Sequence, residues 1–170
     1  REGIRPDLVI GDFDSMPEPD EAIDCVRVPV EKDDTDSMLA LREGLRRGCT
    51  EFHLYGATGG RRLDHTLANI QTLRWLQCEG AEGHIIDDDC EMWMLTDGQI
   101  KLKRREGWCL SVFAYTKQCE GVSLSGVLYP LDRVVLTDSF PLGVSNEITE
   151  SEASITVERG TLVVMQQRDL

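Results

Sequence analysis

Apolar positions in the first hundred residues alternate between the spacing of strands and the spacing of helices. The strand-like runs are short and are bounded by turn or acidic residues: 8–10, 25–28, 52–55 and 84–86. Helical spacing appears from Thr35 to Arg47, where Leu41 and Leu45 are four residues apart and Gly48 follows. It appears again over residues 63–77, and strands that alternate with helices in this way predict a parallel sheet covered by helices.

The pattern changes after about residue 96. Short alternating segments separated by turn residues replace the helical spacing: 100–103, 109–115, 121–124, 133–136, 154–157 and 162–165. Many short strands of this kind predict a sandwich or barrel-like domain. The sequence therefore predicts the α/β fold class, with an N-terminal parallel-sheet α/β domain at residues 1–97 followed by a C-terminal all-β sandwich domain at residues 98–170.

Composition narrows the classes of partner. The formal net charge is −13 over 170 residues, whereas nucleic acids and anionic membranes require a basic surface. The sequence contains no apolar run of the ~20 residues that a transmembrane helix needs. The six cysteines show no CxxC pair and no Cys/His ligand spacing, which is typical of reduced cysteines in the cytoplasm. We expect a cytoplasmic protein with no nucleic-acid partner and no membrane association.

Two aspartates follow the first predicted strand, in the segment Gly11–Ser15. Asp12 and Asp14 are two residues apart at the carboxyl end of that strand, where open α/β sheets bind their ligands. Hard carboxylate oxygens on a loop suit Mg²⁺, which usually takes one or two protein carboxylates together with phosphate and water. The alternative is a turn in which the aspartates accept hydrogen bonds from backbone N–H groups. The motif alone leaves both interpretations open.

A second acidic segment, Lys32–Asp36, lies immediately before the predicted helix. Helix capping and the helix dipole explain one or two acids at this position, but the segment holds Asp33, Asp34 and Asp36. A divalent cation would relieve their mutual repulsion, and Lys32 would reach a phosphate. We therefore interpret this segment as part of a metal–phosphate site.

The segment Gly56–His65 follows one predicted strand and opens a helix. Its glycines allow the backbone to approach a ligand closely, and the helix that follows offers N–H groups to an anion. Arg61 and Arg62 offer guanidinium groups to phosphate oxygens, and Asp64 and His65 lie in the first turn of the predicted helix. The spacing matches neither the GxxxxGK[ST] loop nor GxGxxG, and His65 fits a capping or packing role equally well.

Two weaker candidates lie further along the chain. Asp87–Asp89 ends a predicted strand, and we interpret it mainly as a solvated turn. Ser145–Glu147 lies in the β region and offers neutral polar groups to the ring nitrogens of a ligand, although by itself it is an ordinary turn. Neither segment identifies a ligand alone.

Taken together and in this order, these motifs resemble the thiamine pyrophosphokinase family. The resemblance covers almost the whole chain, through the segments 6–15, 32–36, 56–70, 124–131 and 145–147. It departs from the family at two points. The family has one arginine where this chain has Arg61 and Arg62, and its opening strand and early Asp-Gly-Gly loop are absent here. Because the chain starts at Arg1, close to a strand, we expect an upstream strand to be missing.

The resemblance implies a Mg²⁺-dependent enzyme that transfers the diphosphoryl group of ATP to the hydroxyl of thiamine, giving thiamine diphosphate and AMP. It implies a homodimer in which the first domain binds ATP and Mg²⁺ and the second binds thiamine. The expected metal ligands are Asp12, Asp14, Asp33, Asp34 and Asp36. The expected catalytic residues are Asp12, Asp34, Arg61 and Asp64. The expected substrate-binding residues are Lys32, Thr35, Gly59, Gly60, Arg62, His65, Ser145 and Asn146. We expect Asp64 to orient or deprotonate the attacking hydroxyl.

Two other functions fit parts of the sequence. Leu8–Asp14 also resembles the strand and DxD motif of haloacid-dehalogenase-type phosphatases, with Asp12 as the nucleophile, and Asp87–Asp89 imitates their later acidic motif. Met16 stands where that family has threonine or valine, and the phosphatase scheme leaves the other two motifs without a role. The second alternative is a thiamine- or metal-binding module without catalysis. Formation of AMP from ATP and thiamine distinguishes the kinase from both.

Overall fold

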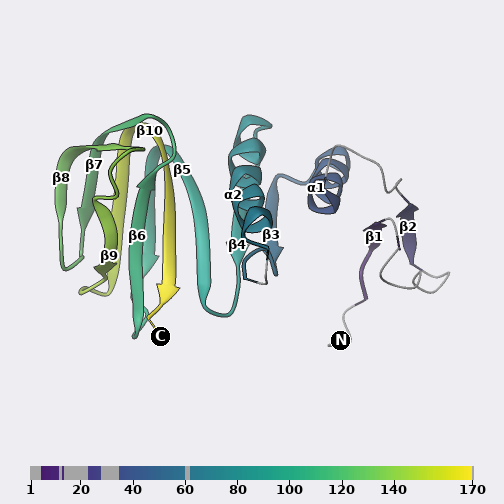
Figure 1. The fold of residues 1–170 in the computed structure, drawn as a ribbon, viewed down its shortest axis with the longest axis horizontal. Helices are drawn as coiled ribbons and strands as arrows, with labels where there is room; N and C mark the ends of the chain where they lie inside the picture. The colour runs from purple at the N-terminus through teal and green to yellow at the C-terminus, as the bar shows by residue number, and fades with distance from the viewer. Residues whose placement is uncertain (1–4, 12, 14–22, 28–34, 60–61, 170) are drawn as a thin grey trace. The chain divides into compact units, whose positions relative to one another are not determined.

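The structure is a computed structural model that describes residues 5–11, 13, 23–27, 35–59 and 62–169. The chain forms two compact units, residues 1–50 and residues 51–170, each with its own secondary structure. Figure 1 shows the elements of each unit. No helix among the described residues is long and apolar enough to cross a membrane.

The first unit contains a parallel pair of strands followed by a helix. β1 (Leu8–Gly11) pairs in parallel with β2 (Asp24–Arg27). α1 (Asp36–Arg46) starts after its N-cap Thr35, whose hydroxyl accepts a hydrogen bond of 3.2 Å from the backbone N–H of Met38. Such a cap satisfies one of the N–H groups that a helix leaves unpaired at its start. The strands and the helix predicted for this part of the chain are confirmed.

In the second unit, a helix connects two parallel strands. β3 (Glu51–Tyr55) and β4 (Glu82–Ile86) pair in parallel, and α2 (Leu63–Cys78) links them. Figure 1 shows α2 lying against this sheet. Leu73 and Leu76 of α2 are fully buried, and burying one leucine side chain contributes about 2 kcal/mol. The buried face of α2 therefore fixes the helix to the sheet.

Gly83 of β4 lies directly beneath α2. A Cβ atom at this position would lie 2.7 Å from Leu76 Cδ1 and 2.8 Å from Leu73 Cδ2, closer than carbon atoms pack. A glycine in a strand often marks such a close approach of another element. The absence of a side chain at Gly83 is therefore what lets α2 pack so tightly on the sheet.

The sheet that contains β3 and β4 is mixed, so the prediction of a wholly parallel N-terminal sheet is wrong in this respect. β5 (Cys90–Lys103) runs antiparallel to β4, and only the turn Asp87–Asp89 joins the two strands. A parallel connection needs a crossover of about a dozen residues, so a turn this short forces the chain to reverse. β5 then continues without interruption into the β region.

β10 (Glu152–Arg168) is the central strand of the second unit. It pairs antiparallel with β5, with β6 (Trp108–Ala114) and with β7 (Gln118–Ser125). The sequence predicted two strands here, separated by a turn at Arg159–Gly160. The structure instead has one strand whose pairing with β5 shifts register at this point, where Gly160 has a φ of 113°. A β-bulge of this kind bends a strand without ending it.

The remaining strands are β8 (Leu131–Thr137) and β9 (Gly143–Glu147). The eight-stranded sheet has the order β3-β4-β5-β10-β6-β9, while β7 pairs with β10 and β8 pairs with β7. The pairs among β5 to β10 are all antiparallel, as the alternating pattern after residue 96 predicts. A single long strand, β10, therefore connects most of the β region.

Two clusters of buried side chains stabilise the second unit. The larger lies among the β strands and includes Leu110, Leu124, Ile155 and Leu162, all 2% exposed or less. The smaller lies between α2 and the sheet and includes Leu73, Ile85, Met92, Met94 and Val163. The smaller cluster also contains Ala57, so the chain segment after β3 is packed into the core.

Candidate active site

The glycine-rich turn after β3 has a constrained backbone. Gly56 and Gly59 have φ values of 65° and 78°, in the left-handed region that glycine adopts without steric cost. Between them, Ala57 is only 8% exposed and Thr58 is half-buried. Gly60, which was expected to bind substrate together with Gly59, lies outside the described residues.

Two elements contact this turn from within the second unit. The side-chain amide of Asn69, in α2, donates a hydrogen bond of 2.8 Å to the carbonyl oxygen of Ala57. The hydroxyl of Thr58 donates a hydrogen bond of 2.5 Å to Oδ2 of Asp87, in the turn between β4 and β5. The glycine-rich turn is therefore fixed to the helix and to the neighbouring hairpin.

The helix that follows the turn begins without a side-chain cap. Arg62 occupies the N-cap position of α2, and within the described part of the chain no side chain caps the helix there. The first N–H groups of a helix have no partner inside the helix, and the helix dipole adds positive potential at this end. Apart from the N–H of His65, which donates to the carbonyl oxygen of Arg62, the N–H groups at the start of α2 are therefore suited to bind an anion such as a phosphate group.

Arg62 and Asp64 form an ion pair at this end of α2. Nε of Arg62 lies 2.9 Å from Oδ1 of Asp64, and Nη2 lies 2.5 Å from Oδ2. The hydrogen bonds from Arg62 lower the pKa of Asp64 to about 2. Asp64 is therefore ionised at neutral pH, and a carboxylate with so low a pKa is a weak base. The ion pair therefore favours a role for Asp64 in orienting a substrate group over a role in accepting a proton from it.

His65 follows in the first turn of α2. Its side chain is exposed, and its backbone N–H donates a hydrogen bond of 3.2 Å to the carbonyl oxygen of Arg62. His65 and Asp64 thus lie on consecutive positions of the same helix end, as the sequence predicted. Arg61 lies outside the described residues.

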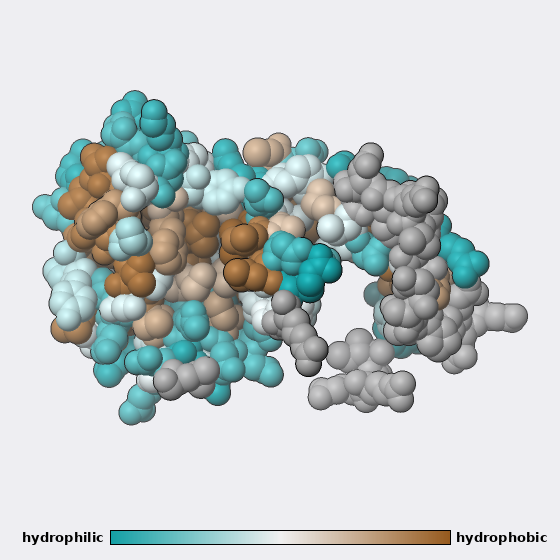
Figure 2. All heavy atoms as spheres, viewed as in Figure 1, coloured by the Kyte–Doolittle hydropathy of each residue, from teal (hydrophilic) through white to brown (hydrophobic). Residues whose placement is uncertain are grey.

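An apolar hollow lies beside Asp64, between α2 and the sheet. Its lining includes Leu67 and Ile70 of α2 and Phe113 and Tyr115 at the end of β6. Figure 2 shows apolar atoms gathered where α2 meets the neighbouring strands. Leu67 is 57% exposed, so a ligand can contact its side chain. A charged helix end and a largely apolar surface are therefore adjacent in this unit.

The acidic segments of the first unit are described only in part. Five of the site residues expected in the first unit lie outside the described residues: Asp12, Asp14, Lys32, Asp33 and Asp34. Thr35 uses its hydroxyl to cap α1, and Asp36 is exposed in the first turn of that helix. Within the described ranges, no three His, Cys, Asp or Glu residues are arranged to hold a metal ion. The magnesium site remains a prediction.

The acids of the turn between β4 and β5 have partners within the protein. Oδ2 of Asp87 accepts the hydrogen bond from Thr58, which is the largest cause of the lowered pKa of this carboxyl. Oδ1 of Asp89 lies 3.0 Å from Nη1 of Arg168, and Asp88 is exposed. Asp87 and Asp89 thus each have a partner in another segment of the chain, while Asp88 is exposed and the side chain of Asp89 is 49% exposed.

Ser145 and Asn146 of β9 face in different directions. Ser145 is exposed and has a φ of 57°, whereas Asn146 is only 4% exposed. Nδ2 of Asn146 donates a hydrogen bond of 2.7 Å to the carbonyl oxygen of Tyr129, and its Oδ1 accepts one of 3.0 Å from the backbone N–H of Tyr129. The amide group of Asn146 is thus bonded to the backbone, and Ser145 presents the polar surface.

Tyr129 was not among the residues expected at the site. Its side chain is 63% exposed, and its backbone is held by Asn146 next to the exposed Ser145. An exposed aromatic ring beside a polar strand end is suited to stacking on a planar ligand. The sequence carried one signal for it, because Tyr129 lies in the segment 124–131, which is among the segments that resemble the family.

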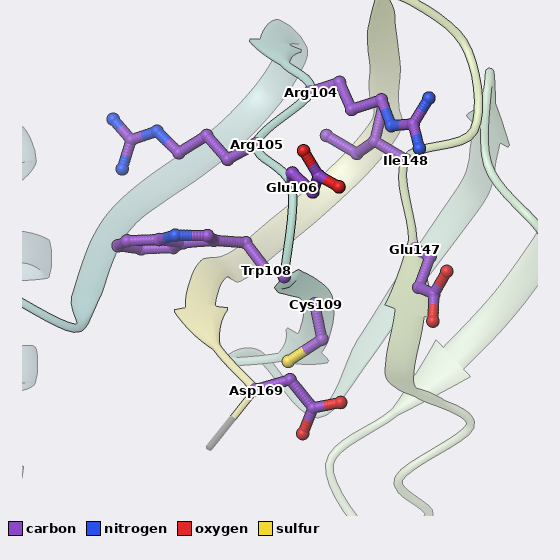
Figure 3. A pocket seen from close by; sticks show the side chains of 9 residues that line it. Arg104, Arg105, Glu106, Trp108, Cys109, Glu147, Ile148 and Asp169 are labelled. Atoms are coloured by element: carbon purple, nitrogen blue, oxygen red, sulfur yellow. The ribbon is translucent and has the colours of Figure 1, made fainter.

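A second hollow lies at the turn between β5 and β6 (Figure 3). The guanidinium group of Arg105 lies over the ring of Trp108, 4.7 Å from the ring centroid. The carboxylates of Glu106, Glu147 and Asp169 surround the same space. Because the walls carry charges of both signs, the hollow shows no preference for a cation or an anion, and we assign no ligand to it.

Comparison with known proteins agrees with the resemblance seen in the sequence. The model of the thiamin pyrophosphokinase catalytic domain matches residues 1–83, and the model of the thiamin pyrophosphokinase vitamin B1 binding domain matches residues 98–162. A thiamine pyrophosphokinase from Bacillus subtilis (strain 168) is 30% identical over 174 residues, and the alignment covers 98% of this chain and 81% of the relative.

Solved structures of this family have the same fold. The thiamine pyrophosphokinase of Bacillus subtilis matches with a TM-score of 0.89 and 29% identity, covering 99% of this chain and 81% of that one. The thiamin pyrophosphokinase of Geobacillus thermodenitrificans matches with a TM-score of 0.84 and 27% identity, covering 98% of this chain and 80% of that one. These matches support neither the phosphatase nor the non-catalytic module. The chain belongs to the thiamin pyrophosphokinase family.

Proposed function

We propose that this protein is a thiamine pyrophosphokinase, which transfers the diphosphoryl group of ATP to the hydroxyl of thiamine and releases AMP. The observation that carries the proposal is the uncapped start of α2, with the Arg62–Asp64 pair beside it and the fixed glycine-rich turn before it. Such a helix end suits a polyphosphate. The matches to both domains of the family support the choice of ATP and thiamine as the two substrates.

The proposed reaction is a direct in-line transfer. The primary hydroxyl of thiamine attacks the β-phosphorus of ATP, and the bond from that phosphorus to the bridging oxygen of the α-phosphate breaks. AMP leaves with that oxygen, and the proton of the hydroxyl is released to solvent. Phosphoryl transfer depends mainly on positioning and on neutralising the charge of the phosphate oxygens. Arg61, Lys32 and the N–H groups at the start of α2 would neutralise that charge. Gly59 and Gly60 would let the backbone approach the phosphates.

The residues expected at the metal site fit Mg²⁺ by their chemistry. All are aspartates, and the carboxylate is the protein ligand that Mg²⁺ prefers. Among the described residues, Asp36 is exposed at the start of α1. Asp12, Asp14, Asp33 and Asp34 would complete the ligand set. A bound Mg²⁺ would neutralise charge on the triphosphate.

We propose that Asp64 orients the thiamine hydroxyl. Its pKa of about 2 makes it a stable acceptor for the hydroxyl proton in a hydrogen bond, while its weak basicity argues against full proton removal in the ground state. Arg62 would hold Asp64 in place through their two-pronged contact. His65, next to it, would contact the phosphates or the hydroxyl from the same helix turn.

Thiamine binding is assigned to the β region. We propose that Ser145 donates a hydrogen bond to the pyrimidine ring, since it is exposed at the end of β9. Asn146 would act through Tyr129, whose backbone it holds. In this proposal residues 1–97 form the ATP- and Mg²⁺-binding domain, and residues 98–170 form the thiamine-binding β-sandwich domain.

We also propose a cytoplasmic homodimer. Exposed apolar side chains gather around β8 and β9, where Phe140 is 66% exposed and Leu142 is 51% exposed. Apolar side chains gathered on a surface are typical of an interface with another chain. The spacing of the six cysteines, with no CxxC pair and no Cys/His ligand spacing, supports the cytoplasm. Sedimentation of the purified protein tests the dimer, and a monomer at all concentrations contradicts it.

The activity is tested by product analysis. The protein incubated with ATP, Mg²⁺ and thiamine should form AMP and thiamine diphosphate in equal amounts, measured by anion-exchange chromatography. Asp12→Asn and Asp34→Asn should each abolish turnover without changing the Tm. The control Glu79→Gln, at the other end of α2, should keep the turnover of the wild type. ADP in place of AMP would exclude diphosphoryl transfer. Full activity of both aspartate variants at saturating Mg²⁺ would remove these residues from the metal site.

A further inference from the structure

We propose that Asp87 and Asn69 are positioning residues, which hold the glycine-rich turn Gly56–Gly59 in the conformation that binds the triphosphate. The inference rests on the proposed function, because it assigns a role to residues that support the phosphate site without touching the ligand. Both residues lie outside the glycine-rich segment Gly56–His65, although Asn69 belongs to the longer segment 56–70 that resembles the family. Each reaches the turn from a different element of the second unit.

Asn69 holds the first half of the turn. Its side-chain amide donates a hydrogen bond of 2.8 Å to the carbonyl oxygen of Ala57, and Ala57 is 8% exposed and packs in the smaller core cluster. A carbonyl group in such a place has little access to water, and an unpaired buried carbonyl is costly. Asn69 therefore fixes the orientation of the peptide group after Ala57.

Asp87 holds the second half. Oδ2 accepts the hydroxyl of Thr58 at 2.5 Å, and Oδ1 accepts the backbone N–H of Asp88 at 3.0 Å. A hydrogen bond from a hydroxyl to a carboxylate at this distance is of the short, charge-assisted kind, about twice as strong as a neutral one. The same contact lowers the pKa of Asp87, so the carboxylate is ionised when the enzyme works.

The two contacts act on consecutive residues between two glycines. Gly56 and Gly59 have φ values of 65° and 78°, and glycine has more backbone freedom than any other residue. Without external contacts, a turn with glycine at both ends would sample several conformations and would lose that freedom on binding. Asn69 and Asp87 remove this freedom before the ligand arrives, which is the general role of residues that support a binding site.

The alternative is that Asp87 contacts the ligand or a metal ion directly. Both of its carboxylate oxygens already accept hydrogen bonds from the chain. The pair Thr58→Val and Thr58→Ser separates the two roles, because valine keeps the volume but removes the hydroxyl, and serine keeps the hydroxyl. If Asp87 acted on the ligand directly, loss of the Thr58 hydroxyl would leave its function largely intact.

The experiment measures kcat and the KM values for ATP and thiamine, together with the Tm. Thr58→Val and Asp87→Asn should each lower kcat/KM for ATP by about tenfold, the effect of losing one charge-assisted hydrogen bond, with the KM for thiamine unchanged. Thr58→Ser should restore kcat/KM to within about twofold of the wild type. Asp88→Asn is the matched control, because it removes one charge from the same turn, and it should behave as the wild type.

Asn69→Ala tests the other contact and should also raise the KM for ATP while leaving the KM for thiamine unchanged. If this variant fails to fold, the Thr58 pair decides the question alone. The inference is overturned if Thr58→Val has wild-type kinetics, or if it lowers the Tm without changing kcat/KM for ATP. The inference is also overturned if Thr58→Ser lowers kcat/KM for ATP as much as Thr58→Val does.

Failure of this inference can be told apart from failure of the proposed function. If the wild-type enzyme forms no AMP with thiamine, the proposed function is wrong, and the positioning role is then judged from binding of a nonhydrolysable ATP analogue with Mg²⁺ by calorimetry. About tenfold weaker binding to Thr58→Val than to Thr58→Ser supports the role, and equal binding overturns it. If the wild type forms AMP and all variants match it, only the inference fails.

Discussion

Replacing Asn146 by alanine tests whether this residue acts on thiamine through the backbone of Tyr129. The substitution removes three hydrogen bonds: 2.7 Å to the Tyr129 carbonyl, 3.0 Å from the Tyr129 N–H and 2.9 Å from the N–H of Glu147. An intramolecular hydrogen bond contributes about 1 kcal/mol net. Because Tyr129 and Glu147 are exposed, water can replace part of what is lost. We therefore expect Asn146→Ala to lower the free energy of unfolding by about 2 kcal/mol.

The expected effect on activity is specific to one substrate. Asn146→Ala frees the backbone of Tyr129, so its exposed ring is no longer held in one position. The KM for thiamine should therefore rise while the KM for ATP stays unchanged. The Asp variant at this position keeps the acceptor for both N–H groups but loses the donor to the Tyr129 carbonyl. Because the substitution also places a carboxylate oxygen against the Tyr129 carbonyl oxygen at a position only 4% exposed, Asn146→Asp should lower the free energy of unfolding at least as much as Asn146→Ala.

The assay combines urea denaturation, followed by circular dichroism, with steady-state kinetics. Gln167→Ala is a suitable control, because it removes an exposed amide side chain from another strand, and it should change the free energy of unfolding by less than about 0.5 kcal/mol. If Asn146→Ala also changes the free energy of unfolding by less than about 0.5 kcal/mol, the loss of about 2 kcal/mol expected from its hydrogen bonds is refuted. A raised KM for ATP with an unchanged KM for thiamine would refute the assigned role.

Three further predictions concern other parts of the site and its support. Gly83→Ala places a Cβ 2.7 and 2.8 Å from the methyl carbons of two leucines of α2, so it should lower the free energy of unfolding by about 1–3 kcal/mol. An unchanged free energy of unfolding in urea denaturation would contradict this packing. Arg62→Gln should raise the pKa of Asp64 from about 2 toward its ordinary 3.8, which carboxyl NMR measures. Because pairing depresses this pKa, the ion pair is complete above pH 3.8 and is lost as the pH falls through about 2. A pKa of Asp64 that is the same in Arg62→Gln and in the wild type would mean that the pair does not form in solution. Ser145→Ala should raise the KM for thiamine alone, and an effect confined to ATP would contradict its placement.

Local spacing predicted the helices and most of the strands of this chain. α2 was expected over residues 63–77 and extends over Leu63–Cys78, because its apolar spacing and the glycine after it act within a few residues. The direction of a strand depends on its partner and on the length of its connection. The segment Asp87–Asp89 was interpreted mainly as a solvated turn, and the sheet before it as wholly parallel, although a connection of three residues already implies a hairpin.

Contacts between residues that are far apart in the sequence could not be predicted from it. The motif Gly56–His65 was recognised as a turn leading into a helix, and the structure places it so. The contacts that fix this turn come from Asn69, 12 residues after Ala57, and from Asp87, 29 residues after Thr58. No periodic pattern marks such pairs, because they depend on how α2 and the hairpin pack on the sheet.

The orientation of Asn146 shows the same limit. The motif Ser145–Glu147 suggested polar groups facing a ligand, but neighbouring residues of a strand point to opposite faces. The pairing of β9 with β6 turns Asn146 inward and leaves Ser145 outside. Which of two adjacent residues faces the ligand is set by strand register, and register needs the partner strand.

The proposed reaction moves two phosphoryl groups together from ATP to thiamine. The most direct measurement follows isotope from ATP labelled in the α-phosphate and, separately, in the β-phosphate, with thiamine and Mg²⁺ present. The β label should appear in thiamine diphosphate in the same molar amount as the α label appears in AMP. Recovery of the β label in ADP or in free pyrophosphate, with none in thiamine diphosphate, would contradict it.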